Sequence, residues 1–350
     1  MAYGPTPRPL PVPMLILAIE SSCDDTAAAL FETRQPGAGV VRSSAVANQD
    51  DLHRAYGGVV PELASRNHIV TIMPVVERAL AQACVTLEAV EGVAVTRGPG
   101  LVGSLLVGLM FAKGLSQARG LPMVGVNHLE GHLLAPMLEH QVEMPYLALV
   151  VSGGHSALFV VENLGRYRRI GTTRDDAAGE AFDKVAKLMG LGYPGGRAID
   201  ELARRGNPQR VRFPRARLRG APFDLSFSGL KTAVALHLGG YRPDNGSQAS
   251  PEDVAASFQE AVVEMLTGAT VRAAREFNLD TVALTGGVAA NSRLRSRLAE
   301  VLEDEGRRMV APSLHYCTDN AAMIALAGSY RLLRGEADRL DIEAVANLAL

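Results

Sequence analysis

Short apolar runs and longer stretches with helical spacing alternate along this chain, and one order of these patterns occurs twice. In the first half, three runs typical of strands precede a helix, a strand, a helix, a strand and a helix. The strands are predicted at 15–20, 26–32, 40–46, 92–96 and 123–126, and the helices at 60–83, 101–119 and from 128 onward.

The second half repeats this order with different residues. Its strands are predicted at 146–151, 156–162, 167–172, 281–284 and 308–311, and its helices at 251–277, 291–303 and 319–333. Strands that alternate with helices form a mostly parallel sheet. The repeated order therefore predicts an α/β duplication with one sheet in each half.

The length of 350 residues is typical of two domains. We expect a disordered Pro-rich extension at 1–13, an N-terminal lobe at 14–144 completed by the C-terminal helix at 319–345, and a C-terminal lobe at 145–318. The second lobe carries an insertion at 174–250, which includes a predicted helix at 178–189. Two such lobes are expected to enclose a central cleft that binds a ligand.

Composition and cysteine spacing argue against a disulfide-rich protein, a CxxC metal protein and a membrane-spanning protein. The chain is 47% hydrophobic and 21% charged, as in ordinary globular proteins, and its three cysteines form no disulfide framework or CxxC metal motif. The apolar stretch at 101–112 is shorter than the roughly 20 residues of a membrane span. We therefore expect a cytoplasmic protein with no membrane contact, and its net charge of −2 confines any nucleic-acid surface to a local patch.

The sequence Asn127-His128-Leu129-Glu130-Gly131-His132 carries the most specific chemical pattern. Helix residues four positions apart differ by about 40° around the axis, so His128 and His132 project from one face. Two imidazoles at this spacing can hold one metal ion, although two ordinary polar helix residues give the same pattern. Glu130 lies on the other side of the helix, unlike the glutamate of an HExxH metalloprotease, which directly follows the first histidine.

A third metal ligand is available in Thr318-Asp319-Asn320, where a helix is predicted to begin. In the simpler interpretation Asp319 is only the N-cap of that helix. As a ligand it would complete a set of two histidines and one carboxylate. That set suits Fe(II) or another divalent ion with open coordination positions.

Glycine-rich turns and paired acids follow several of the predicted strands. Ser152-Gly153-Gly154 and Thr285-Gly286-Gly287 allow backbone amides to approach a phosphate closely, so they favour a nucleotide pocket. Asp24 and Asp25 follow the first strand, where they could act as a general base, order a second cation or simply form the turn.

Positive charge is concentrated in one segment. Between Leu202 and Gly220 the chain has seven arginines and no acidic residue. Such a segment is either a solvated loop or a surface that binds a phosphate backbone with steep salt dependence.

Nine segments in order closely resemble the TsaD family, formerly called Gcp, whose members have a two-lobed actin-like fold related to sugar kinases and Hsp70. These segments are 20–26, 56–66, 127–132, 150–155, 175–184, 193–196, 227–231, 285–291 and 318–320. The match extends from about 15 to 333, so we expect the actin-like duplication with its central cleft.

The resemblance implies roles for individual residues. His128, His132 and Asp319 match the metal ligands of the family, with Fe²⁺ as the expected ion and Zn²⁺ compatible with the ligand types. Asp24 and Asp25 match the acidic pair of the family and are the candidate catalytic residues. The residues that match the threonylcarbamoyl-adenylate site are Val150, Val151, Ser152, Gly153, Gly154, Asp183, Gly196, Asp200 and Asn291.

The resemblance also implies an acyltransferase. Threonylcarbamoyl-AMP would donate its threonylcarbamoyl group to the N6 amine of adenosine 37, in the anticodon loop of tRNAs that read ANN codons, with partners of the TsaB and TsaE type. An actin-like ATPase shares the expected fold but does not need the histidine pair. A metalloprotease is the other alternative, and the position of Glu130 argues against it.

Overall fold

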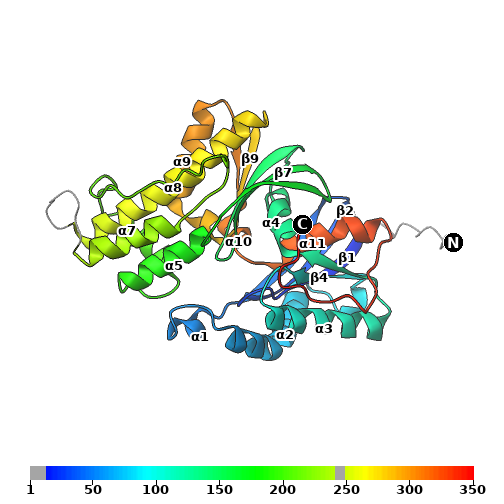
Figure 1. Ribbon diagram of the computed structural model, residues 1–350. Helices are drawn as coiled ribbons and strands as arrows, with labels where there is room; N and C mark the ends of the chain where they lie inside the picture. The colour runs from blue at the N-terminus through cyan, green and yellow to red at the C-terminus, as the bar shows by residue number, and fades with distance from the viewer. Residues whose placement is uncertain (1–12, 241–248) are drawn as a thin grey trace. The chain divides into compact units, whose positions relative to one another are not determined.

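The computed structural model describes residues 13–240 and 249–350 (Figure 1). Apart from Pro13, the predicted extension at 1–13 lies outside the described residues, as does the part of the predicted insertion at 241–248. The chain divides into two compact units. Unit 1 contains the described residues up to Leu52 together with Val59–Gln141 and Asp319–Leu350, and unit 2 contains His53–Gly58 and Val142–Thr318.

Unit 1 is built on a five-stranded sheet in the order β3-β2-β1-β4-β5. The strands are β1 (Met14–Glu20), β2 (Thr26–Gln35), β3 (Ala38–Ala47), β4 (Gly92–Gly98) and β5 (Met123–Asn127). Ala18 of β1 is opposite Ala29 of antiparallel β2 and Ala94 of parallel β4, and β5 runs parallel to β4. The parallel strands β1, β4 and β5 therefore end at one edge of the sheet.

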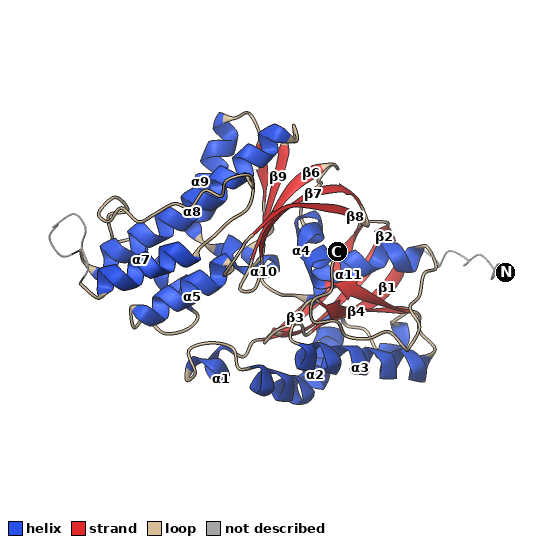
Figure 2. Ribbon diagram, in the orientation of Figure 1, coloured by secondary structure: helices blue, strands red, loops and turns tan. Residues whose placement is uncertain are grey.

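Helices cover both faces of this sheet (Figure 2). On one face, Leu17 and Ile19 pack against α2 (Pro61–Ala83) and α3 (Val102–Arg119). On the other face, Ala94 and its neighbours pack against α11 (Ala321–Leu333), which also contacts α4 (His128–Leu134). The alternation of side chains along each strand produces these two apolar layers. The remaining elements of unit 1 are η1 (Leu87–Ala89) and η2 (Ala135–Leu138), and the boundary between the units falls within α1 (Asp50–Arg54), after Leu52.

Unit 2 has a second five-stranded sheet with the same connectivity, in the order β10-β9-β6-β7-β8. Its strands are β6 (Tyr146–Val151), β7 (Ser156–Asn163), β8 (Arg166–Thr172), β9 (Thr281–Thr285) and β10 (Arg308–Val310). Its helices are α5 (Ala178–Leu188), α6 (Gly195–Ala203), α7 (Ser228–Leu238), α8 (Pro251–Glu276), η3 (Gly287–Ala290), α9 (Ser292–Asp304) and α10 (Leu314–Cys317). β6, β9 and β10 are parallel, as β1, β4 and β5 are.

The predicted duplication is therefore confirmed, because each sheet places its first strand between an antiparallel and a parallel neighbour. Two helices within the predicted insertion were not expected from the sequence. Helix α6 begins with Gly195 and Gly196, which are poor helix formers, and α7 buries only Leu230 and Val234, too few for a clear period. Among the described residues, no helix has the length and apolar character needed to cross a membrane.

Packing of α4 against α11 includes one buried polar contact. The Tyr330 hydroxyl donates a hydrogen bond to Glu130 Oε1 at 2.9 Å, and both side chains are buried. A buried carboxylate that loses a donor bears an uncompensated desolvation cost. This bond therefore contributes to the position of α4 on unit 1.

We expect Tyr330→Phe to lower the free energy of unfolding by about 1–3 kcal/mol, because it removes the donor to Glu130 and leaves the ring in place. Urea denaturation would measure the change. Tyr56→Phe is a matched control, since Tyr56 is 58% exposed. Equal stability of the two variants would show that Glu130 does not depend on this bond.

Candidate metal centre and substrate loops

The two histidines lie directly after strand β5. Asn127 is the N-cap of α4, and its Oδ1 accepts a hydrogen bond from Leu129 N, so the helix begins at His128. His128 and His132 are one turn apart in this short, wholly buried helix, with ring centroids 4.7 Å apart. The structure thus places both imidazoles on one face, as the spacing predicts.

Asp319 reaches the same place from the segment before α11. The N-cap of α11 is Asn320, whose side chain accepts from Met323 N, so the interpretation of Asp319 as an N-cap is wrong. Asp319 Oδ1 lies 3.2 Å from His132 Nε2 and 3.5 Å from His128 Nε2. The structure therefore brings together all three residues that the sequence suggested as ligands.

The spacing of these atoms fits a shared metal ion. One ligand atom from each side chain lies within 4.8 Å of the other two. Ligands held about 2.0–2.2 Å from a common ion are themselves separated by about 3–3.5 Å at tetrahedral or octahedral angles. The two Nε2–Oδ1 distances fall in this range, so the side chains need little movement to coordinate an ion.

Glu20, the last residue of β1, orients His128. Its fully buried carboxylate accepts hydrogen bonds from Ser22 N and from the Thr96 hydroxyl, each at 2.5 Å, and lies 3.0 Å from His128 Nδ1. Burial alone would raise the pKa of Glu20, but the charge and the hydrogen bond of His128 outweigh burial and lower it. Because an ionised carboxylate only accepts, it selects the His128 tautomer with hydrogen on Nδ1.

That tautomer presents a lone pair at Nε2, toward the carboxylate of Asp319. Two facing acceptors repel unless a proton or a metal cation lies between them. Burial lowers the pKa of His128, but Asp319 and Glu20 together raise it to about 9, so the site attracts positive charge. Burial and His128 lower the pKa of His132, which keeps this ring neutral and available as a ligand.

His132 Nδ1 is buried and has no hydrogen-bond partner within residues 13–240 and 249–350. Its Nε2 lies toward Asp319, so a cation bound at Nε2 would leave the ring proton on Nδ1. The donor set, the distances and the charge of this site all fit a divalent ion.

The predicted catalytic pair lies on the turn between β1 and β2. Asp24 and Asp25 are partly buried, four and five residues after Glu20. Burial raises the pKa of Asp25 well above its ordinary range, and the negative charges of Asp319 and Asp24 raise it further. Asp25 thus shares the electrostatic environment of the candidate metal ligands.

Glu130 points away from this centre, as the sequence predicted. Its carboxylate accepts the Tyr330 hydrogen bond instead of facing the two histidines. A glutamate that activates metal-bound water must reach the metal, so this position does not support the metalloprotease alternative.

The predicted substrate residues of unit 2 begin at the end of β6. Val150 and Val151 are fully buried in the sheet, so only their backbones are available for a ligand. Ser152 N donates to His155 O at 2.7 Å and closes a turn that exposes Gly153 and Gly154. This loop therefore presents backbone at the carboxyl end of a parallel strand, the usual position of ligands in α/β sheets.

A second loop follows the neighbouring parallel strand, β9. Gly286 has φ +95°, and a Cβ there would lie 2.3 Å from Val151 O, so a side chain is excluded on both grounds. Gly179 in α5 is similarly close to the first loop, since a Cβ would lie 2.6 Å from Ser152 O. These glycines allow the backbones around both loops to approach one another.

The other predicted substrate residues lie in α5, in α6 and at the N-cap of α9. Asp183 Oδ1 accepts from Gly195 N at 2.8 Å, which joins α5 to the start of α6, where Gly196 lies. Asp200 Oδ1 accepts from the Ser292 hydroxyl at 2.8 Å. Asn291 caps α9 through Leu294 N, and its amide donates to Gln259 at 2.8 Å. The segment Tyr193–Gly196 follows α5 and includes the first two residues of α6.

Sequence reasoning did not assign Glu20, Ser22 or Thr96 to the site. The available signal was an acidic residue at the end of an otherwise apolar strand, because a buried carboxylate requires several donors. Those donors come from the β1–β2 turn and from β4, which only the parallel sheet brings close.

Comparison with known proteins identifies the family of the chain. The sequence model of TsaD, described as tRNA N6-adenosine threonylcarbamoyltransferase, matches residues 40–326. The chain belongs to the TsaD family.

Relatives in this family match the chain over nearly its whole length. A protein of Syntrophotalea carbinolica named tRNA N6-adenosine threonylcarbamoyltransferase is 52% identical, over 96% of this chain and 97% of its own length. A protein of the same name from Anaeromyxobacter dehalogenans is 54% identical, over 94% of this chain and 97% of its own length.

Solved structures show the fold that the TsaD resemblance implied. Full-length HypF in its phosphate- and nucleotide-bound form has a TM-score of 0.62 at 17% identity, over 95% of this chain and 57% of its own. Component A of (R)-2-hydroxyglutaryl-CoA dehydratase from Acidaminococcus fermentans has a TM-score of 0.52 at 15% identity, over 91% of this chain and 99% of its own. The fold is thus actin-like, as predicted.

We expect Glu20→Gln to weaken divalent-metal affinity about 10- to 100-fold, the usual effect of losing a partner that orients a metal-bound histidine. Titration against a chromophoric chelator would measure the affinity. His315→Ala, which removes an exposed histidine outside the cluster, should leave it unchanged. An unaltered affinity in Glu20→Gln would mean that His128 needs no orienting carboxylate.

Proposed function

We propose that this chain transfers the threonylcarbamoyl group of threonylcarbamoyl-AMP to the N6 amine of adenosine 37 in tRNAs that read ANN codons. The most direct support is that relatives named for this activity are 52% and 54% identical to this chain over nearly its whole length. In the reaction, a bond forms between N6 and the carbamoyl carbon, the bond from that carbon to the AMP oxygen breaks, and the amine loses one proton. Its substrate also makes the cytoplasm the proposed location.

Residues of unit 1 would hold the metal. His128 and His132, through Nε2, and the Asp319 carboxylate are the proposed ligands, with Fe²⁺ as the expected ion and Zn²⁺ compatible with the same donors. When bound, such an ion polarises and orients oxygen atoms of a substrate. Glu20 keeps the His128 ring in the required orientation, and burial of the two histidines excludes water.

Residues of unit 2 would hold the adenylate. The proposed contacts are Val150, Val151, Ser152, Gly153, Gly154, Asp183, Gly196, Asp200 and Asn291. The exposed backbone of Gly153 and Gly154 suits close approach to a phosphate or ribose. Asp200 is already oriented by Ser292 and Arg204, so it can accept a substrate hydroxyl without reorganisation.

Alignment should supply much of the rate enhancement. The adenosine amine is a weak nucleophile because its lone pair is delocalised into the purine, whereas AMP is a good leaving group. Asp24 and Asp25 are the proposed acidic groups that accept the amine proton. Burial raises the pKa of Asp25, which makes its ionised carboxylate a stronger proton acceptor.

Proteins of the TsaB and TsaE type are the proposed partners. Helix α3 exposes Val102, Leu106 and Met110, one turn apart, and the neighbouring α2 exposes Ile69, Val70 and Met73. Large exposed apolar side chains that recur along adjacent helices indicate a protein interface. We propose that a TsaB-type partner covers this apolar surface of unit 1.

Transfer of labelled threonylcarbamoyl from its adenylate to unmodified tRNA, with the partners present, would test the proposed function. Activity that disappears with a chelator and returns with Fe²⁺ or Zn²⁺ is the expected result. A fully metallated, folded protein that transfers nothing to tRNA in the presence of its partners would contradict it.

We expect Asp25→Asn to lower the single-turnover rate about 10²- to 10⁴-fold with little change in metal content, because the amide cannot accept the proton. Rapid quenching with labelled adenylate would give the rate. Asp51→Asn, which alters an exposed carboxylate, is the control. A rate like that of the control would exclude Asp25 as the base.

We expect the double variant Leu106→Asp and Met110→Asp to abolish binding of the TsaB-type partner with little loss of stability, since both side chains are exposed. Calorimetric titration would measure binding. Leu314→Asp is the control, at a side chain that is 61% exposed in unit 2. Retained binding would place the partner elsewhere.

A further inference from the structure

The arginine-rich segment of unit 2 extends along α8. The segment bonds to that helix through Asn207 N to Asp253 at 2.8 Å, Val211 N to Ser257 Oγ at 3.1 Å and Arg215 Nε to Glu264 at 2.7 Å. Just after the segment, Pro222 O accepts a hydrogen bond from Arg272 Nε at 3.1 Å. Asp253 and Arg272 are 19 residues apart in α8, which corresponds to a rise of about 28 Å along the helix axis. The segment therefore distributes its arginines along a line.

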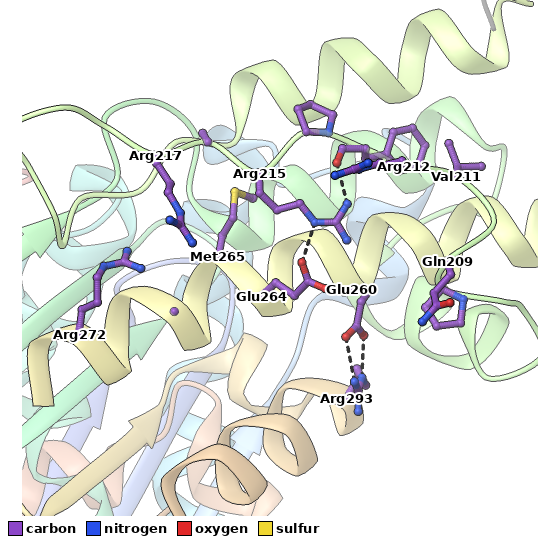
Figure 3. A pocket seen from close by; sticks show the side chains of 15 residues that line it. Gln209, Val211, Arg212, Arg215, Arg217, Glu260, Glu264, Met265, Arg272 and Arg293 are labelled. Carbon is purple, nitrogen blue, oxygen red and sulfur yellow. Dashed lines mark hydrogen bonds and ion pairs between the residues drawn. The ribbon is translucent and has the colours of Figure 1, made fainter. Parts of the chain in front are cut away.

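An open cavity of about 900 Å³ lies between this segment, α8 and the start of α9 (Figure 3). Five arginines line it, namely Arg212, Arg215, Arg217, Arg272 and Arg293. The acidic residues of its lining are Glu260 and Glu264, so three positive charges remain without a matching negative charge.

Two of the five arginines are bound to these acids. Arg293 makes a bidentate ion pair with Glu260, with Nε–Oε2 and Nη2–Oε1 distances of 2.7 and 2.8 Å. Arg215 binds Glu264. Arg212 and Arg217 have no carboxylate partner in the part of the chain that the structure describes. In Figure 3, Arg217 and Arg272 point toward each other.

Like charges thus face each other at one end of the cavity. Burial lowers the pKa of Arg272, and the charge of Arg217 lowers it further. The sequence of α8 explains why no acid intervenes. Positions 260, 264, 268 and 272 follow one another at helical spacing, and they carry glutamate, glutamate, glycine and arginine. Of these four positions, only 260 and 264 can therefore neutralise an arginine of the cavity.

We infer that Arg212, Arg217 and Arg272, here called the arginine strip, bind the phosphodiester backbone of the tRNA substrate. The inference deepens the proposed function and rests on it. Guanidinium groups pair well with phosphate oxygens, and their distribution along a helix suits a polyanion better than a single small anion. The lining of the cavity also has a structural connection to the candidate adenylate residues, since Gln259 binds Asn291 while the next residue, Glu260, binds Arg293.

The double variant Arg212→Gln and Arg217→Gln tests the arginine strip. We expect weaker tRNA binding and a slope of log K against log salt that is smaller by about 1.4–1.8, the value for two lost phosphate contacts. The KM for tRNA should rise while kcat at saturating tRNA is retained. The double variant Arg275→Gln and Arg297→Gln removes the same charge from arginines paired with Glu305 and Glu300, and should keep the wild-type slope.

A second variant leaves every arginine in place. Gly268→Glu adds a carboxylate between the paired and unpaired arginines, where the nearest atom to a new Cβ is Arg272 Nη1 at 3.3 Å. Glutamate favours a helix more than glycine, so the variant should be at least as stable as the wild type and yet bind tRNA more weakly.

These experiments distinguish a failure of the arginine-strip inference from a failure of the proposed function. If the wild type fails to transfer the group, the proposed function is wrong, and the salt slopes still test the strip. Wild-type slopes in both the double glutamine variant and Gly268→Glu would overturn the inference. So would loss of AMP or inorganic phosphate binding in the double variant with an unchanged tRNA slope, because the cavity would then be a small-anion site.

Discussion

The candidate metal centre depends on the hydrogen bonds of one buried carboxylate, that of Glu20. It receives a hydrogen bond from the β1–β2 turn and one from β4, and it fixes the ring that follows β5. A buried charge is costly unless several donors surround it, so the carboxylate requires these three segments to stay together. The same bonds select the tautomer that directs His128 Nε2 toward Asp319. Sheet topology and metal chemistry are thus linked through one residue.

The two units use one topology for different chemistry. In unit 1, the ends of the parallel strands carry charged and imidazole side chains, whereas in unit 2 they carry glycine-rich loops with exposed backbone. The first arrangement suits a cation, and the second suits a ligand that needs close backbone approach. A shared actin-like fold therefore does not determine function, which follows from the side chains at the strand ends.

The sequence predicted most of the fold because its elements have strong local periods. The ten predicted strands lie within two residues of their predicted bounds, apart from β2, which ends three residues later than predicted, at Gln35. The spacing of His128 and His132 is local as well, so it could be recognised. The role of Glu20 could not, because its partners are distant in sequence and are joined only by parallel pairing. Asp319 and Asn320 are both good N-caps by residue type, and only the observed backbone shows that Asn320 caps the helix.

The arginine-rich segment has a second property that the sequence alone does not predict. Seven arginines without an acid between Leu202 and Gly220 predict a basic patch, but they do not reveal which ones are neutralised. Neutralisation depends on α8, where Glu264 binds Arg215 and Glu260 binds Arg293, and the next position along that face, 268, carries a glycine. The ion pair of Arg215 with Glu264 holds the segment on the helix, and this order leaves Arg212 and Arg217 available. A chain with a net charge of −2 can in this way present a local, positively charged surface for a polyanion without having a basic domain.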